Sequence, residues 1–183
     1  DGTASAGYGG SIFAKGVVNI DNCRFIDNIA TNANGGAVFW YGTNGTIVGS
    51  NFTNNRANGT VTCIMGNSGD GGAIMWTGSN GLVENSEFVN NSAEDNGGAI
   101  YMGSGDLSII NTDSDNILNV KGNSANDGAA VYSENGNVLV WANGGDILLG
   151  VYANELFEIR IKELKFLRLS MNSNRSIEFQ EGY

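Results

Sequence analysis

Two short motifs recur in fixed order along this chain, and they restrict its fold more than any other feature. The first is a pair of glycines followed by a small, a β-branched and a large apolar residue, as in NGGAVFWYGTNG at residues 34–45 and DGGAIMWTGSNG at residues 70–81. The twin glycines begin at Gly9, Gly35, Gly71 and Gly97, with a degenerate copy, DGAAVY, at Gly128. Self-similarity on this scale is the signature of a repeat architecture.

The second motif is Phe-x-x-Asn, which begins at Phe25, Phe52 and Phe88. It follows each twin glycine after 16 or 17 residues, and Val120 and Asn123 take its place in the last copy. The interval from this motif to the next twin glycine varies, because the stretch Asn58–Asn67 is inserted in one copy. The last copy carries about six extra residues before Val120, near NTDSDN at residues 111–116. Insertions of this kind indicate loops that leave a corner of a regular object.

The segments between the Gly and Asn turns are typical of short β-strands. GAVFW, GTIVGSNF, GAIMW and GAIYM are rich in β-branched and aromatic residues. No unit of this size can bury its own apolar face, whereas stacking one unit on the next at about 4.8 Å buries a continuous column. The sequence therefore predicts an all-β parallel β-helix.

Stacking in register gives each repeated residue a physical role. The twin glycines supply positive φ or room for close backbone approach at a corner. Stacked asparagine amides can hydrogen bond along the column, and the phenylalanines would stack inside. The predicted ladder is Asn28, Asn55, Asn91 and Asn123, and the predicted stack is Phe25, Phe52 and Phe88.

Two cysteines occur, Cys23 and Cys63. Cys23 lies two residues before Phe25, as Ser50 and Ser86 do before the next phenylalanines, and strand alternation puts this station on the inward face. We therefore expect Cys23 to be a small buried core residue, with a disulfide between the two cysteines as the alternative.

The two motifs resemble those of known surface proteins. GGA(I/V) with FxxN resembles the repeat of the polymorphic outer-membrane autotransporter passengers of intracellular bacteria. NNSAEDNGGAIYM and GGAVFWYGTNGTIVGSNFTNN are similar to the adhesin-like surface proteins of methanogenic archaea. The resemblance covers about Gly7 to Asn143. It implies a right-handed parallel β-helix of the pectin-lyase-like kind and an extracellular, cell-surface location.

Composition divides the chain near residue 150. We expect residues 1–150 to form the β-helix repeats and residues 151–183 to form a C-terminal cap or an atypical tail. The stretch from Asn154 to Phe179 has no glycine, and apolar residues alternate at Phe157, Ile159 and Ile161, which predicts a strand. An amphipathic helix over Leu156–Met171 is the alternative. A cap would protect the open end of the stack from aggregation.

Charge and hydropathy restrict the class of partner. The formal net charge of −10 argues against nucleic acid, whose phosphates need a basic face. No apolar run is long enough to span a bilayer, so we expect no membrane insertion in this segment. The chain begins in mid-pattern, from which we expect it to be part of a longer protein.

Acidic and aromatic residues near the twin glycines suggest two binding sites. Asp70, Glu94 with Asp95, and Asp127 precede twin glycines, and stacked carboxylates could bind Ca²⁺; solvated corner residues are the alternative.

Trp40 and Trp76 occupy one station after the glycines, and alternation sends either this column or its neighbour outward. Outward tryptophans would stack on sugars, and inward ones would fill the core.

Catalysis has the weakest support in the sequence. Arg24 and Arg56 do not share a repeat station, and Asp113 and Asp115 lie in a turn. The chain has no histidine, which excludes Ser–His and Cys–His nucleophiles. The sequence therefore assigns no catalytic, cofactor-binding or metal-binding residue.

We expect an extracellular adhesin-like module that binds or projects by a rigid scaffold, with a glycan or protein of a host or neighbouring cell as partner. A polysaccharide lyase or glycoside hydrolase on the same scaffold, and a purely structural surface repeat, are the alternatives.

Overall fold

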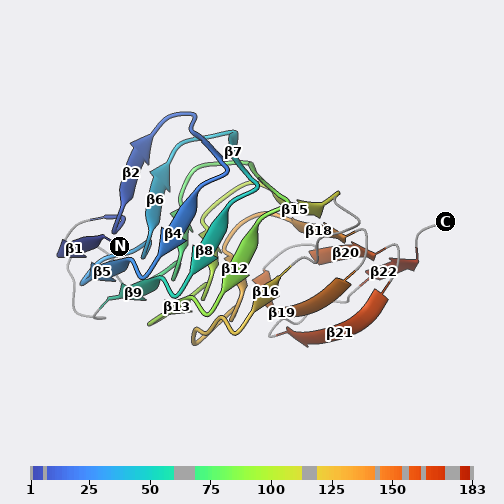
Figure 1. Cartoon of the computed structure of the whole chain (residues 1–183). Coiled ribbons are helices and arrows are strands. Elements are labelled where there is room, and N and C mark those ends of the chain that lie inside the picture. Colours follow the sequence, from blue (N-terminus) through green and yellow to red (C-terminus); the bar gives the residue numbers. More distant parts are fainter. Residues whose placement is uncertain are drawn as a thin grey trace.

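The chain folds into a parallel β-helix, as the repeats predict (Figure 1). The structure is a computed structural model that describes residues 2–5, 8–59, 69–112, 119–142, 145–153, 157–161, 164–171 and 178–181. Within these ranges the regular elements are all strands, and every strand pairs in parallel with its neighbours. The insertions predicted at residues 58–67 and 111–116 fall mostly on residues 60–68 and 113–118, outside the described residues.

Four parallel sheets form the walls of the solenoid, and each is named here after its first strand. The β1 sheet contains β1 (Thr3–Ser5), β5 (Ile29–Thr31), β9 (Arg56–Asn58) and β13 (Ser92–Ala93). The β2 sheet contains β2 (Ile12–Lys15), β6 (Val38–Tyr41), β10 (Ile74–Trp76), β14 (Ile100–Met102), β17 (Val131–Ser133), β19 (Gly145–Ala153) and β21 (Leu164–Met171). The β3 sheet contains β3 (Asn19–Asp21), β7 (Gly45–Val48), β11 (Gly81–Glu84), β15 (Leu107–Asn111), β18 (Val138–Ala142), β20 (Phe157–Ile161) and β22 (Glu178–Glu181). The β4 sheet contains β4 (Arg24–Ile26), β8 (Asn51–Thr53), β12 (Glu87–Val89) and β16 (Val120–Lys121).

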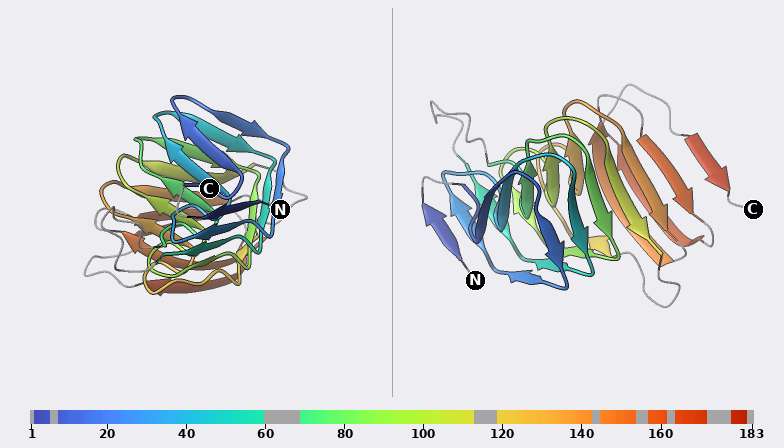
Figure 2. Two further views of the ribbon diagram at one scale, coloured as in Figure 1. Left: turned by 90° about the vertical axis from the view of Figure 1, so that its left-hand side faces the viewer. Right: turned by 90° about the horizontal axis from the view of Figure 1, so that it is seen from above.

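Each coil visits the sheets in the same order, so repeated residues from successive coils lie side by side. Figure 2 shows the coils stacked from the N-terminal to the C-terminal end. Phe25 pairs with Phe52, which pairs with Phe88, and their rings stack with centroids 4.7 and 4.9 Å apart. Val120 continues this column opposite Phe88. The predicted phenylalanine stack is therefore confirmed.

The asparagine ladder is also confirmed, and every polar atom of its central amides is used. The Asn91 backbone N and side-chain Nδ2 donate to Asn123 Oδ1 at 2.9 and 3.0 Å, and Nδ2 also donates to the Phe52 carbonyl at 2.9 Å. Asn91 Oδ1 accepts from the backbone N and the Nδ2 of Asn55, both at 2.9 Å. Asn28 donates to Asn55 in the same way. Buried amides remain inexpensive only when bonded like this.

The twin glycines have the two roles that the sequence suggests. The first glycine of each pair has a positive φ between 60° and 70°, as at Gly35 and Gly71, a conformation that L side chains rarely adopt. The second approaches the next coil closely. A Cβ atom built on Gly36 would lie 2.0 Å from the Gly72 carbonyl oxygen, so only glycine permits the stacking distance at this corner.

Two neighbouring inward columns fill the core together, with a large side chain in one column beside a small one in the other. We call this pairing of large and small residues the volume exchange. Trp40 and Trp76 point inward with no exposed surface, and their rings stack at 4.3 Å and 10°. Glycines at positions 45 and 81 provide the space, because a Cβ on Gly81 would lie 2.8 Å from the ring of Trp76. In the next coil Met102 replaces tryptophan, and Leu107 replaces glycine. The larger residue of one column is thus matched by the smaller residue of the other.

Cys23 is exposed, so the prediction that it is a buried core residue is wrong. It shares its station with Ser50 and Ser86, which are buried, and its backbone N donates to Ser50 Oγ at 3.0 Å. The difference arises from its position in the stack: β4 is the edge strand of its sheet, and no described strand covers its other side. Cys63 lies outside the described residues, so the disulfide stays a prediction.

The tail forms strands, as expected from its alternating residues. β20 and β22 extend the β3 sheet, while β19 and β21 extend the β2 sheet. These strands stack on the last repeat in parallel. β19 runs across residue 150, and the division into repeats and a capping segment stays a prediction. The described residues contain no helix with the length and hydropathy to cross a membrane.

The asparagine ladder leads to a stability prediction. Asn91→Asp removes the donors to Phe52 and Asn123 and buries a carboxylate against two acceptors, which should cost about 3 kcal/mol or more in the free energy of unfolding at neutral pH. Burial raises the pKa of such a carboxyl, so stability should partly return as the pH falls and the group is protonated. Urea unfolding at pH 7 and pH 4 measures both effects.

Asn90→Asp is the matched control for this substitution. Asn90 is adjacent and exposed, with a φ of 56° that aspartate also tolerates. It should change the stability by less than about 0.5 kcal/mol. Equal losses for the two variants would show that the ladder does not contribute as described.

The volume exchange leads to a coupling prediction. Gly81→Ala should cost about 1–3 kcal/mol because the added methyl overlaps the Trp76 ring. In a Trp76→Met background the same substitution should cost clearly less, since the next coil combines methionine with leucine. A double-mutant cycle of denaturant unfolding measures the coupling. An equal cost in both backgrounds would contradict steric exchange between the two columns.

Candidate functional site

The predicted aromatic site is not on the surface. Trp40 and Trp76 are fully buried, so the interpretation that they fill the core is confirmed and their stacking on sugars is wrong. Each indole Nε1 donates to a corner carbonyl, Trp40 to Gly16 at 2.9 Å and Trp76 to Gly42 at 3.2 Å. Alternation along the strands sends the neighbouring column outward instead.

Over three coils this outward column forms a closed strip, whereas Phe13 at its N-terminal end is 49% exposed. Phe39, Met75 and Tyr101 form a second cluster, separate from the main core, and are only 7–8% exposed. The Tyr101 hydroxyl donates to Glu134 Oε2 at 2.5 Å. Burial raises the pKa of the Tyr101 phenol, and the hydrogen bond to Glu134 raises it further, so the hydroxyl stays a donor over the physiological range. The strip offers little surface to a ligand.

The acidic residues near the twin glycines do not converge on one point. Asp70 lies in a second ladder, where its Oδ1 accepts from the backbone N and the Nδ2 of Asn96 at 3.1 and 3.0 Å. Asp127 forms a parallel β-bridge with Asn96 from the next coil. Glu94 is exposed and lies outside this ladder. No three His, Cys, Asp or Glu side chains cluster as a metal-binding group in the described part of the chain.

The residues weighed for catalysis are not brought together. Arg24 lies in β4 and Arg56 in β9, which belong to different sheets. Asp113 and Asp115 lie outside the described residues. The two arginines therefore stand in different walls of the solenoid, and the absence of a catalytic site stays a prediction.

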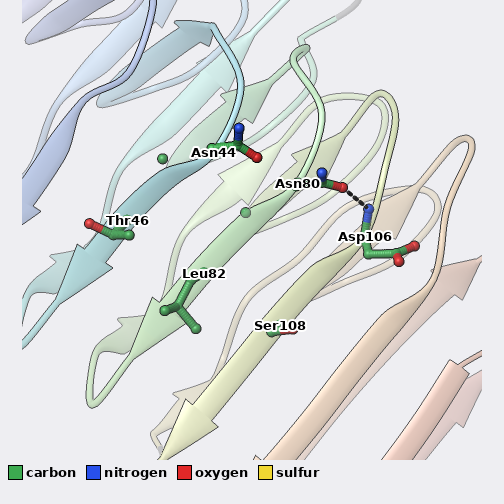
Figure 3. Close-up of a pocket in the computed structure, with 8 residues that line it drawn as sticks. Asn44, Thr46, Asn80, Leu82, Asp106 and Ser108 are labelled. Atoms are coloured by element: carbon green, nitrogen blue, oxygen red, sulfur yellow. Dashed lines mark hydrogen bonds between the residues drawn. The ribbon is translucent and has the colours of Figure 1, made fainter.

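A shallow polar groove lies on the outer face of the β3 sheet (Figure 3). Its volume is about 420 Å³, and it crosses the outward sides of β7, β11 and β15. Asn44 and Asn80, both with a φ of 56°, stand where β7 and β11 begin, and Asp106 holds the same station before β15. We call this set, continued by Asn137, the polar row.

Hydrogen bonds along the stack hold the polar row in place. Asn80 Oδ1 accepts from the Asp106 backbone N at 3.2 Å. Asp106 Oδ1 in turn accepts from the backbone N and the Nδ2 of Asn137 at 3.0 and 2.9 Å. The side chains of Asn80, Asp106 and Asn137 are therefore oriented by bonds to neighbouring coils without a ligand.

Two further outward rows lie beside the polar row. Register places the middle row on Thr46, Leu82, Ser108 and Leu139. It places the outer row on Val48, Glu84, Ile110 and Trp141. All eight residues are half-buried, while the residues between them, such as Val83 and Val140, are buried. This face is the candidate site, and Trp141 is the outward-facing tryptophan that the sequence reasoning missed.

A second groove of about 300 Å³ lies on the other side of the same turns. It is lined by Tyr41, Gly42, Thr43, Thr77, Gly78, Ser79 and Ser104. Tyr41 is 63% exposed, and the other lining residues are small. Polar surface thus continues around the corner from the β3 sheet.

Comparison with known proteins supports the assignment of the repeat. Residues 85–103 match the Chlamydia polymorphic membrane protein repeat. This stretch runs from β12 to β14 and contains one copy of each motif, with Phe88, Asn91 and Gly97. No curated protein and no solved structure matches the chain. The match supports a surface-associated, autotransporter-like repeat region.

The calcium interpretation leads to a thermal prediction. We expect the melting temperature to be the same with excess calcium and with a chelator, because Asp70 is already bonded within its ladder. Differential scanning calorimetry measures it. A rise in calcium would show that the acidic residues hold a cation.

Proposed function

We propose that this chain is a segment of an extracellular adhesin-like protein, a rigid rod that holds a partner on its outer face without catalysis. The proposal rests on the different roles of inward and outward residues. The repeated residues, such as Phe52, Asn91 and Gly71, are used inside the stack or at its corners. The outward rows differ from coil to coil, so recognition belongs to them.

Stiffness follows from the way the coils are joined. Every described strand pairs in parallel with a neighbouring coil, with one register shift between Gly145 and Asp146 in the β19–β21 pair. The asparagine ladder ties three consecutive intervals between coils. A rod of this kind projects a binding face away from a cell and presents it without an ordering cost at the moment of contact. The match to a surface-associated repeat, and the resemblance to adhesin-like archaeal proteins, support this role.

An adhesion assay tests the proposal. Labelled chain is applied to a panel of host and bacterial cells, and the retained fraction is compared with that of heat-unfolded chain. We expect retention of the folded chain only, and no release of reducing ends from polysaccharides incubated with it. Released reducing ends would favour the enzyme alternative. Absence of retention on every cell type would favour a purely structural repeat.

A further inference from the structure

The outer face of the β3 sheet combines a polar row, a middle row and an outer row that contains the indole of Trp141. We propose that this face binds the chain of a neutral glycan. The inference rests on the proposed adhesive function and deepens it by naming the partner class and the site. Four observations support it: the position of Trp141, the oriented polar row, the charge of the face and the dimensions of the groove.

Trp141 gives the face an aromatic platform. In β18, Val138 and Val140 are buried and Leu139 and Trp141 are half-buried, so the indole projects outward. It lies opposite Ile110 in the next strand of the sheet. The apolar faces of pyranose rings pack on an exposed aromatic ring, whose polar N–H remains available to hydroxyls.

The polar row supplies hydrogen bonds at one edge of the face. Asn44, Asn80 and Asn137 carry amides, which donate and accept, while Asp106 accepts. The bonds from Asp106 to Asn80 and from Asn137 to Asp106 fix the orientation of Asn80, Asp106 and Asn137 before any ligand arrives. Paired donors and acceptors of this kind suit the adjacent hydroxyls of a sugar. Figure 3 shows Asn44, Asn80 and Asp106 in line along the stack.

Charge selects among glycans. From β7 to β18 the charged residues of the three rows are Asp106 and Glu84, both acidic, and the chain has a net charge of −10. In β20, Glu158 and Arg160 follow Leu139 and Trp141 in register, so the added positive charge is matched by a further negative one. Carboxylates or sulfates on a glycan would meet a net negative charge on this face and would be repelled. Neutral sugars avoid this cost, so the face favours them over uronates and sialylated chains.

The dimensions fit an extended oligosaccharide better than a folded protein. The groove of about 420 Å³ lies within the range of small-ligand sites, and its rows are only half-buried. Thr46 and Ser108 alternate with Leu82 and Leu139, which gives hollows between apolar steps. A chain lying along the stack passes one coil about every 4.8 Å, so it meets an apolar step at every second coil. A protein partner would need a larger, more apolar centre.

A glycan array with four variants tests the inference. The probes are neutral hexasaccharides of glucose, galactose, mannose and N-acetylglucosamine, printed beside polygalacturonate and sialylated oligosaccharides. We expect wild-type chain to bind at least one neutral probe and no acidic one. Trp141→Ala and Asn80→Gly should each weaken that binding by about tenfold or more. Glycine keeps the positive φ of Asn80, so the turn is preserved.

Two control variants separate loss of the site from loss of the fold. Phe13→Ala removes an aromatic ring that is 49% exposed on the β2 sheet. Asn54→Gly removes another exposed asparagine with positive φ, whose Nδ2 donates to Asp27 Oδ1 at 3.1 Å at the turn after β8, away from the β3 sheet. Both should bind the neutral probe as wild type does. Equal losses in control and site variants would overturn the assignment of this face.

Cell adhesion distinguishes the inference from the function on which it rests. If the chain is retained on cells, the inference expects retention to fall when cell-surface sugars are oxidised with periodate and when Trp141 is replaced by alanine. Retention that survives both treatments but not protease digestion of the cells would overturn the glycan inference and leave the adhesive function standing. Binding to acidic probes, or to no neutral probe, would also overturn the inference. Absence of any retention would overturn the adhesive function.

Discussion

The in-register asparagine ladder is the interaction on which the rest of the structure depends. A buried amide is tolerated only when its donors and acceptor are paired, and Asn91 meets this condition through Asn55, Asn123 and the Phe52 carbonyl. A slip of one residue between coils would break these bonds and turn every inward side chain outward. The ladder therefore fixes the register that aligns the phenylalanines, the tryptophans and the corner glycines.

Because the register is fixed, residues inside the stack and residues on its outer face are under different constraints. Inside the stack, steric demands from the coils above and below restrict each position, as the exchange of Trp76 with Gly81 and of Met102 with Leu107 illustrates. On the outer face, side chains meet solvent and are free to vary, as Thr46 and Leu82 do at one station. A stiff rod with a variable surface suits adhesion, because the scaffold positions binding groups without having to change shape.

Much of the framework could be predicted from sequence, since Phe-x-x-Asn and the twin glycines have a physical role only in a stack. The direction of Trp40 could not, because alternation allows either of two adjacent columns to face inward. The inward direction of Trp40 is decided by Gly45, because a side chain at that position would overlap the Trp40 ring. Exposure of Cys23 depends on its position just before the edge strand β4, which the repeat itself does not encode. Trp141 lies outside the repeated motifs, so its outward position follows from pairing with Ile110.

Fluorescence of a Trp141→Phe variant tests most directly the claim that the repeated motif is buried framework. The chain has three tryptophans, so this variant reports only on Trp40 and Trp76. Their complete burial predicts emission at short wavelength and almost no quenching by acrylamide in the folded state, with both properties lost in denaturant. Emission at long wavelength with strong quenching in the folded state would place these rings in solvent and contradict the stacked framework.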